Sequence, residues 1–286
     1  MNETSPRLEV SRAGRPQWGD VTTTRPVHVG PVTFGEGLPV VIAGPCAVES
    51  LEQTLEIAQE VRDAGAEMLR GGAFKPRTSP YSFQGLGERG LEILAEVRER
   101  TGLPVVTEVM DTRRVELVAS YADMLQVGSR NMQNFPLLIE VGKAHKPVLL
   151  KRGWSATLEE WLYAAEYIAA QGNLDIVLCE RGIRAFPLND YSRNILDLNI
   201  LPALREETFL PVIVDPSHAT GRADRVPAAA RAALAVGADG LIIEVIGERT
   251  VRADVSCDGE QGIVPAVLRE LMAHLRAQTP PISAAG

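Results

Sequence analysis

Short apolar runs alternate with longer amphipathic stretches along most of the chain. Eight runs rich in valine, isoleucine and leucine predict β-strands, at residues 40–43, 68–70, 105–109, 124–127, 148–150, 176–179, 212–214 and 241–245. Apolar residues at helical spacing predict helices between and after them, at 51–64, 90–100, 113–120, 135–143, 158–170, 192–205, 227–236 and 262–276. Glycine-containing turns such as DAGAE and RTGLP follow several of these stretches and are typical of helix C-termini.

This alternation predicts the fold class. Strands that alternate with helices form parallel sheets, and eight such units in ~240 residues predict an α/β protein of the (β/α)8 TIM-barrel type. The continuous apolar runs LIIEV and VIVD are typical of barrel strands that are covered on both faces. The alternative is an open doubly wound sheet, which is less favoured because no GxGxxG motif follows the first strand.

The two ends of the chain lie outside this alternation. Residues 1–37 are expected to be a short N-terminal extension, and the possible hairpin lies at 27–37. The first ~30 residues show no sustained periodicity, so we expect a mobile arm there. Residues 38–278 are expected to form the barrel and residues 279–286 a tail. The polar N-terminus lacks the apolar core of a signal peptide.

Composition narrows the possible partners and the compartment. The chain has 29 Lys and Arg against 37 Asp and Glu, a net charge of −8, which argues against a general nucleic-acid surface. Local cations in a pocket can still bind an anion. The three cysteines have no paired spacing and suit a reduced cytoplasmic protein. No window approaches ~18 uninterrupted apolar residues, so we expect no membrane span.

Four residues of metal-binding type lie at or after the ends of predicted strands. Cys46 closes VVIAGPC, His218 follows VIVDPS, Glu244 lies in LIIEV and Asp258 lies in the later SCDGE. Each alone has a simpler explanation, such as a buried thiol or a hydrogen-bonded histidine. Together at one rim of a barrel they form a mixed set of soft and hard ligands. Such a set suits a divalent transition metal better than Mg²⁺ or Ca²⁺.

Cations also gather at the carboxyl ends of the predicted strands, where TIM barrels carry their chemistry. Besides the four residues above, the ionisable residues at these ends are Arg70, Lys75, Arg77, Glu108, Arg130, Lys151, Arg152, Glu180, Arg181 and Asp215. A ring of cations is unfavourable without an anion, and guanidinium groups bind phosphate and carboxylate bidentately. The loop KPRTS at 75–79 adds the hydroxyls of Thr78 and Ser79 and predicts a phosphate-binding loop. A solvated basic turn would have the same composition.

Several stretches resemble the 3-deoxy-D-arabino-heptulosonate 7-phosphate (DAHP) synthase family, in its compact microbial subtype. That subtype is similar in sequence to 3-deoxy-octulosonate 8-phosphate synthase. The resemblance spans about residues 38–275. Its long motifs are AGPCAVES (43–50), GGAFKPRTSPYSFQGLG (71–87), QVGSRNMQNFPLL (126–138), PVLLKRG (147–153), LCERGIR (178–184) and VDPSHATGR (214–222).

The resemblance implies the first committed step of the shikimate pathway, in which phosphoenolpyruvate and erythrose 4-phosphate give DAHP and phosphate. It places the metal ligands on Cys46, His218, Glu244 and Asp258, for Mn, Fe, Co or Zn, and implies no nucleotide cofactor. It also implies a homo-oligomer, a dimer or a tetramer. The family's phosphoenolpyruvate-binding residues fall on Arg70, Lys75, Arg130, Lys151 and Arg181, with Glu108 among them.

Further roles follow from the same resemblance. Arg77, Thr78 and Ser79 are expected to bind the phosphate of the aldose. Lys75 is the expected proton donor, and Glu108 is expected to position the water that attacks phosphoenolpyruvate. A metal-bound His218 completes the catalytic set.

Some alternatives stay open. The chain departs from the family pattern after Glu244. Ile246-Gly247 stands in place of His-Pro, and Asp258 lies fourteen residues after Glu244, where the family's aspartate ligand lies about eleven residues on. Asp254 is therefore an alternative to Asp258 as the fourth ligand. A related synthase would use another aldose, such as arabinose 5-phosphate, or act in secondary metabolism. A third alternative is a non-catalytic barrel that binds sugar phosphates.

Overall fold

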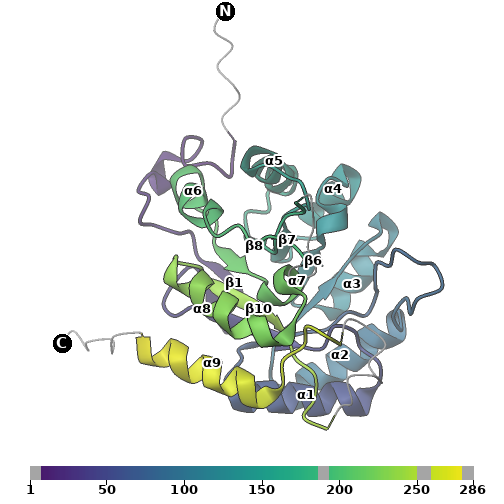
Figure 1. Ribbon diagram of the computed structural model, residues 1–286. Coiled ribbons are helices and arrows are strands. Elements are labelled where there is room, and N and C mark those ends of the chain that lie inside the picture. Colours follow the sequence, from purple (N-terminus) through teal and green to yellow (C-terminus); the bar gives the residue numbers. More distant parts are fainter. Residues whose placement is uncertain (1–7, 186–192, 250–258, 279–286) are drawn as a thin grey trace, which may run out of the picture.

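Eight parallel strands form a closed barrel in the computed structural model, which describes residues 8–185, 193–249 and 259–278 (Figure 1). Each strand pairs with the next one along the chain, and the last pairs with the first. The (β/α)8 prediction is therefore confirmed. The barrel strands are β3 (Val40–Gly44), β4 (Met68–Arg70), β5 (Val105–Glu108), β6 (Met124–Val127), β7 (Val148–Lys151), β8 (Ile176–Glu180), β9 (Val212–Val214) and β10 (Gly240–Glu244).

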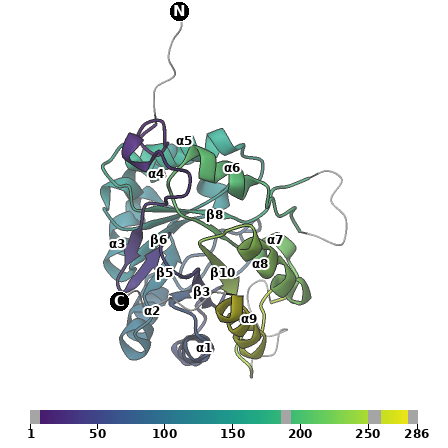
Figure 2. The same ribbon diagram turned by 90° about the vertical axis from the view of Figure 1, so that its left-hand side faces the viewer.

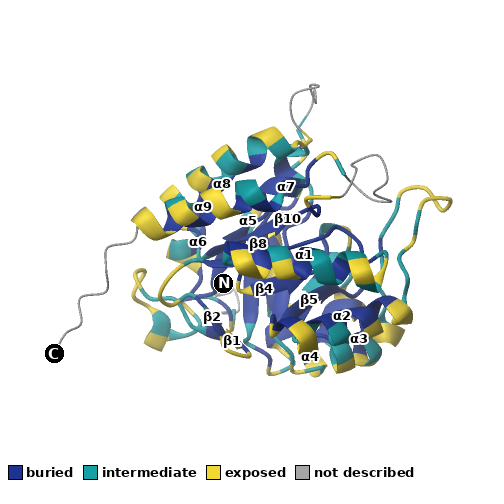
Figure 3. Ribbon diagram, turned by 90° about the horizontal axis from the view of Figure 1, so that it is seen from below, coloured by how far each residue is buried: buried dark blue, intermediate teal, exposed yellow. Residues whose placement is uncertain are grey.

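Helices surround the barrel, and their exposed residues lie mainly on the outer side (Figure 3). They are α1 (Leu51–Ala64), α2 (Glu88–Thr101), α3 (Val115–Tyr121), α4 (Phe135–Lys143), α5 (Leu158–Ala169), α6 (Ile200–Glu207), α7 (Pro216–Thr220), α8 (Val226–Ala235) and α9 (Pro265–Gln278). Figures 1 and 2 show α9 beside α1, with which it is in contact, so the last helix closes the layer against the first. No helix in the described ranges is both long enough and apolar enough to cross a membrane.

Local sequence fixes where several helices begin and end. The Ser50 side chain accepts a hydrogen bond from Gln53 N and caps α1, while Thr157 forms a capping box at the start of α5. The helices α1 and α2 end at Gly65 and Gly102, both in the left-handed conformation that glycine adopts without steric cost. The predicted C-cap signals at these two turns are thus confirmed.

A two-stranded hairpin closes the bottom of the barrel. It consists of β1 (Val27–Val29) and β2 (Val32–Phe34), which pair antiparallel. Its buried side chains share one apolar cluster with residues inside the barrel, among them Ile42, Met68 and Met124. Met68 and Met124 are the first residues of their strands, and Val40, the first residue of β3, belongs to the same cluster, so the opposite, carboxyl-terminal rim is left for a site.

The N-terminal segment differs from our expectation. Residues 8–25 pack against the barrel instead of forming a mobile arm. Val10 is fully buried, and Ser11 forms an isolated bridge with Thr208. The buried Arg12 guanidinium donates hydrogen bonds to the backbone carbonyls of Trp18, Asp20, Val21, Thr23 and Arg205. Because hydrogen bonds from one buried arginine hold residues 8–25 in place, this segment does not need a periodic pattern of apolar residues.

The predicted helix at 192–205 is wrong in its first part. Helix α6 begins only at Ile200, and the described residues before it form a loop in which Ile195 bridges to Ile183. This loop brings Arg193 and Asn194 to the carboxyl-terminal rim. The short helix α7 was not predicted, because five residues directly after a strand give no helical periodicity.

Candidate active site

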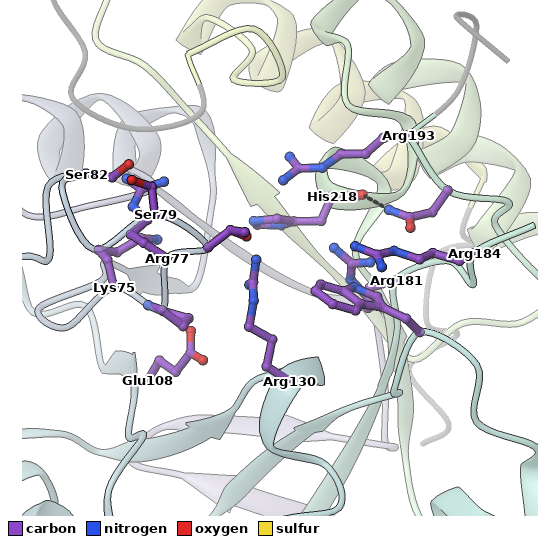
Figure 4. A pocket seen from close by; sticks show the side chains of 14 residues that line it. Lys75, Arg77, Ser79, Ser82, Glu108, Arg130, Arg181, Arg184, Arg193 and His218 are labelled. Atoms are coloured by element: carbon purple, nitrogen blue, oxygen red, sulfur yellow. Dashed lines mark hydrogen bonds between the residues drawn. The ribbon is translucent and has the colours of Figure 1, made fainter. Parts of the chain in front are cut away.

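The carboxyl ends of the barrel strands surround a cavity of about 730 Å³ (Figure 4). Residues at or just after the ends of β5, β6, β7, β8 and β9, together with the KPRTS loop, line it. Predicted site residues on its wall are Lys75, Arg77, Thr78, Ser79, Glu108, Arg130, Arg181 and His218. A smaller, deeper pocket adds Arg70 and Lys151. The structure therefore brings together all the residues that we expected to bind or transform the substrates.

Three of the four expected metal ligands also meet at this rim. Cys46 follows β3, His218 lies in α7 and Glu244 ends β10, and one donor atom of each lies within 4.8 Å of the other two. Cys46 and Glu244 are buried. A thiol, an imidazole and a carboxylate at this spacing fit a divalent transition metal. Asp258 and its alternative Asp254 lie outside the described residues.

Asp215 orients the histidine of this group. Its Oδ2 atom lies 2.7 Å from His218 Nδ1 and also contacts Lys151 Nζ, while its Oδ1 atom accepts a hydrogen bond from His218 N. Burial opposes ionisation of Asp215, but His218 and Lys151 outweigh it and hold its pKa well below the usual range. Burial lowers the pKa of His218, which favours neutral imidazole. A proton on Nδ1 leaves Nε2 as the metal-binding atom.

Cations stabilise the two anionic ligands. Lys75 Nζ lies 3.1 Å from Cys46 Sγ and 2.8 Å from the Cys46 carbonyl oxygen. A cation at this distance favours the thiolate, the form that binds metal. Burial would raise the pKa of Glu244, but His218, Arg70 and Lys75 outweigh it and lower the pKa to about 2. Arg70 NH2 lies 3.2 Å from Glu244 Oε1.

The deeper pocket contains polar atoms that a ligand would satisfy. Glu108 Oε2 accepts a hydrogen bond from Gln126, whereas Glu108 Oε1 and Arg181 NH1 are buried without a hydrogen-bond partner among the described residues. Burial raises the pKa of Glu108 against the opposing charges of Lys75 and Lys151, and lowers the pKa of Arg181. A pocket that contains buried cations and a buried carboxyl suits an anionic ligand. The carboxyl would bind a water or a group that donates a proton.

Trp154 is a site residue that the sequence analysis missed. It lines the cavity three residues after β7, and the guanidinium carbons of Arg130 and Arg184 lie 4.8 and 4.0 Å from the centre of its ring. Cation–π contacts at these distances hold both arginines in place. Its position directly after a barrel strand was the available signal. Arg184, Arg193 and Asn194 also line the cavity and were missed, the last two because we placed them in a helix.

Two strand-end residues have a structural role instead. Arg152 and Glu180 are buried and pair with each other at 3.0 Å, and Arg152 also pairs with Asp197 at 2.9 Å. Neither lines the cavity. They tie β7 and β8 to the loop before α6, next to the residues that do line it.

Comparison with known proteins identifies the family. The model of the DAHP synthetase I family matches residues 19–282. The chain belongs to this family. The family predicted from the motifs is thus confirmed, and with it an enzyme of the DAHP synthase type.

Individual DAHP synthases share most of the chain. Phospho-2-dehydro-3-deoxyheptonate aldolase of Thermotoga maritima is 49% identical over 250 residues, which cover 87% of this chain and 72% of that protein. The crystal structure of the DAHP synthase from this organism matches with a TM-score of 0.87 and 46% identity, over 95% of this chain and 76% of that one. A truncated form of the T. maritima enzyme matches with a TM-score of 0.83 and 43% identity, over 94% of both chains.

Octulosonate enzymes are related at greater distance. The 2-dehydro-3-deoxyphosphooctonate aldolase of Syntrophotalea carbinolica is 35% identical over 270 residues, which cover 86% of this chain and 95% of that protein. The similarity in sequence to the octulosonate enzymes that the resemblance implied is thus confirmed.

Proposed function

We propose that the chain condenses phosphoenolpyruvate with erythrose 4-phosphate to give DAHP and phosphate, the first step of the shikimate pathway. The observation that carries this proposal is the position of the Cys46, His218 and Glu244 cluster beside a cationic cavity, in a member of the DAHP synthetase I family. The heptonate relative shares 49% of its aligned residues with this chain, against 35% for the octonate relative.

The cations would hold the enol phosphate. Arg130, Lys151 and Arg181 would bind its carboxylate and phosphate, because guanidinium forks match both groups and Lys151 adds a point charge. Fixing the reactant in this way lowers the entropic part of the barrier. The KPRTS loop would bind the aldose phosphate at the cavity wall through Arg77, Thr78 and Ser79.

A divalent ion held by Cys46, His218 and Glu244 would act as a Lewis acid on the aldehyde carbonyl of the aldose. The carbon–carbon bond then forms between C3 of phosphoenolpyruvate and the aldehyde carbon. Lys75, whose Nζ lies 3.1 Å from Cys46 Sγ, would protonate the aldehyde oxygen. Glu108 would orient the water that adds to C2, and phosphate then leaves. The fourth ligand, Asp258 or Asp254, and the metal itself, Mn, Fe, Co or Zn, belong to this proposal.

Purified protein tests the proposal directly. We expect DAHP from phosphoenolpyruvate and erythrose 4-phosphate, loss of activity with a chelator, and recovery with one of the four metals. The matched reaction with arabinose 5-phosphate should be much slower. Faster turnover of arabinose 5-phosphate would favour the octulosonate reaction, and ligand binding without any turnover would favour a non-catalytic barrel.

The compartment and the oligomeric state of the enzyme are further parts of the proposal. A metal-binding Cys46 must stay reduced, which supports the cytoplasm as the compartment. We also propose a homo-oligomer, a dimer or a tetramer. Light scattering on the purified chain measures its mass, and a monomer at micromolar concentration would contradict this part.

A further inference from the structure

Gln261 connects the proposed metal centre to the wall of the cavity. It is 1% exposed and lies outside the helices and strands, between β10 and α9. Its Nε2 atom donates a hydrogen bond to Glu244 Oε2, and its Oε1 atom accepts one from Arg193 NH1 at 2.6 Å. Arg193 itself lines the cavity. The side chain thus joins a metal ligand to a substrate-facing arginine.

These contacts fix which way round the amide lies. A guanidinium only donates hydrogen bonds, so the Gln261 oxygen faces Arg193 and the nitrogen must face Glu244. The bond to Glu244 Oε2 then leaves Oε1, which also accepts a hydrogen bond from Arg70 NH2 at 3.2 Å, as the carboxylate atom on the metal side. Glu244 Oε1 lies 3.3 Å from His218 Nε2, the nitrogen expected to bind the ion.

The backbone around Gln261 is held independently of its side chain. Ile263 N donates to the Glu244 carbonyl oxygen at 2.9 Å, and Ile246 N donates to the Ile263 carbonyl oxygen at 3.0 Å. Replacing the Gln261 side chain therefore leaves these links in place. Packing alone does not need a buried amide at this position, because burying a polar group is unfavourable unless its partners are correctly placed.

We propose that Gln261 is a positioning residue that directs Glu244 Oε1 toward the metal, and that Arg193 influences metal binding through Gln261. The inference rests on the proposed metal centre. Groups that orient a ligand typically change metal affinity by about 10–100-fold when they are removed. Arg193 would contribute less, since the amide can still reach Glu244 without it.

Metal affinity tests this inference without any assay of turnover. Mn²⁺ is titrated into the metal-free wild type, Gln261→Met, Arg193→Met and the double variant. We expect Gln261→Met to weaken Mn²⁺ binding roughly 10–100-fold and Arg193→Met to weaken it less. The double variant should bind like Gln261→Met, because the proposed effect of Arg193 on Glu244 passes through the Gln261 amide. Gln171→Ala, after α5 on the opposite rim, is the matched control and should bind like the wild type.

Thermal unfolding of each metal-free variant checks that it is folded. Gln261→Asn, which is too short to reach both partners, replaces Gln261→Met if the latter fails to fold, and the same weakening is expected. If a folded Gln261 variant binds Mn²⁺ as tightly as the wild type, this inference is wrong, but the proposed function is unaffected. The same conclusion follows if Arg193→Met weakens Mn²⁺ binding equally in the wild-type and Gln261→Met backgrounds. A wild-type protein that binds no divalent ion would overturn the proposed function as well.

Discussion

Glu108 is a carboxyl buried among cations, and its two oxygens are in different situations. Gln126 donates a hydrogen bond to Oε2 at 3.3 Å, while Oε1 has no such partner in the described part of the chain. Burial raises the pKa of Glu108 above its usual value although Lys75 and Lys151 oppose the shift. The folded protein therefore keeps a carboxyl whose ionised form is disfavoured by burial, at the position where we expect it to orient a water.

Glu108→Gln should make the metal-free protein more stable but less active. A raised pKa means that the folded state binds the Glu108 proton more tightly than the unfolded state does. The wild type therefore loses stability as pH rises from the ordinary carboxyl pKa through the raised one. The amide that replaces the carboxyl does not titrate, so the gain should be largest at neutral pH and disappear below the ordinary carboxyl pKa. Chemical denaturation across pH measures this, and a pH-independent difference would contradict it.

The same substitution should lower kcat. Loss of a group that orients or deprotonates water typically reduces the rate roughly 10²–10⁴-fold. An unchanged kcat in steady-state kinetics would show that Glu108 does not act on the water.

Gly128 provides the space for the Glu108 carboxyl. A Cβ atom at this position would lie 2.1 Å from Glu108 Oε1, although the Gly128 backbone, at φ −72°, suits any residue. Gly128→Ala should therefore displace Glu108 and lower kcat/KM roughly 10–100-fold, the cost of a small misplacement of a catalytic group.

The matched control is Gly102→Ala at the end of α2. No atom lies within 4 Å of its added Cβ, but φ is +76°. This variant should lose about 1 kcal/mol of stability and keep its kcat/KM. Equal activity of the two variants would show that the space next to Glu108 is unimportant.

At the scale of elements, the sequence predicted those helices and strands whose bounds depend on the local pattern of apolar and capping residues. The strands are continuous apolar runs because both their faces are buried, and the bounds of β4, β6 and β9 came out as predicted. α1 and α4 were also predicted to the residue, since a capping side chain and a clear apolar period mark them. The errors fall where long-range contacts decide, as in the segment held by Arg12 and the loop before α6.

Much of the candidate site could also be predicted, from the residues at the strand ends. A closed parallel barrel brings every carboxyl end to one rim, so residues such as Cys46 and Glu244 meet whatever their distance in sequence. Asp215, Arg193 and Gln261 act on other site residues through contacts that only the folded chain defines. Asp215 was expected at this rim from its strand end, although its contact with His218 was not. The residue types of Arg193, Gln261 and Trp154 carried no separate signal.

The hairpin of β1 and β2 should matter for stability and not for chemistry. Phe34 is fully buried in the apolar cluster at the bottom of the barrel, far from the cavity residues. Phe34→Ala should cost about 3–5 kcal/mol of unfolding free energy and leave kcat nearly unchanged in protein that is still folded. The exposed His28 on the same hairpin is the control, and His28→Ala should cost no more than about 0.5 kcal/mol. A large loss of kcat in folded Phe34→Ala would contradict this division of roles.

For the molecule as a whole, the distribution of charge differs from what the net charge alone would indicate. The chain carries a net charge of −8, yet arginines and lysines line the cavity at one end of the barrel. The acidic balance argued against a nucleic-acid surface, but it did not exclude an anionic ligand in a local cationic cavity. The cations of the cavity repel one another, so an anion that binds between them should stabilise the fold.

Phosphoenolpyruvate should therefore raise the thermal stability of the metal-free protein. A ligand that binds only the folded state adds about 2.7 kcal/mol at roughly 100 times its Kd. Sodium chloride at the same ionic strength should add far less, because it screens the cations without bridging them. Arg181→Met removes one buried guanidinium of the deeper pocket and should abolish most of the shift, whereas Arg62→Met on the outside of α1 should keep it. Equal shifts from both salts, or an undiminished shift in Arg181→Met, would show that the cations respond to ionic strength alone and do not form a site for the enol phosphate.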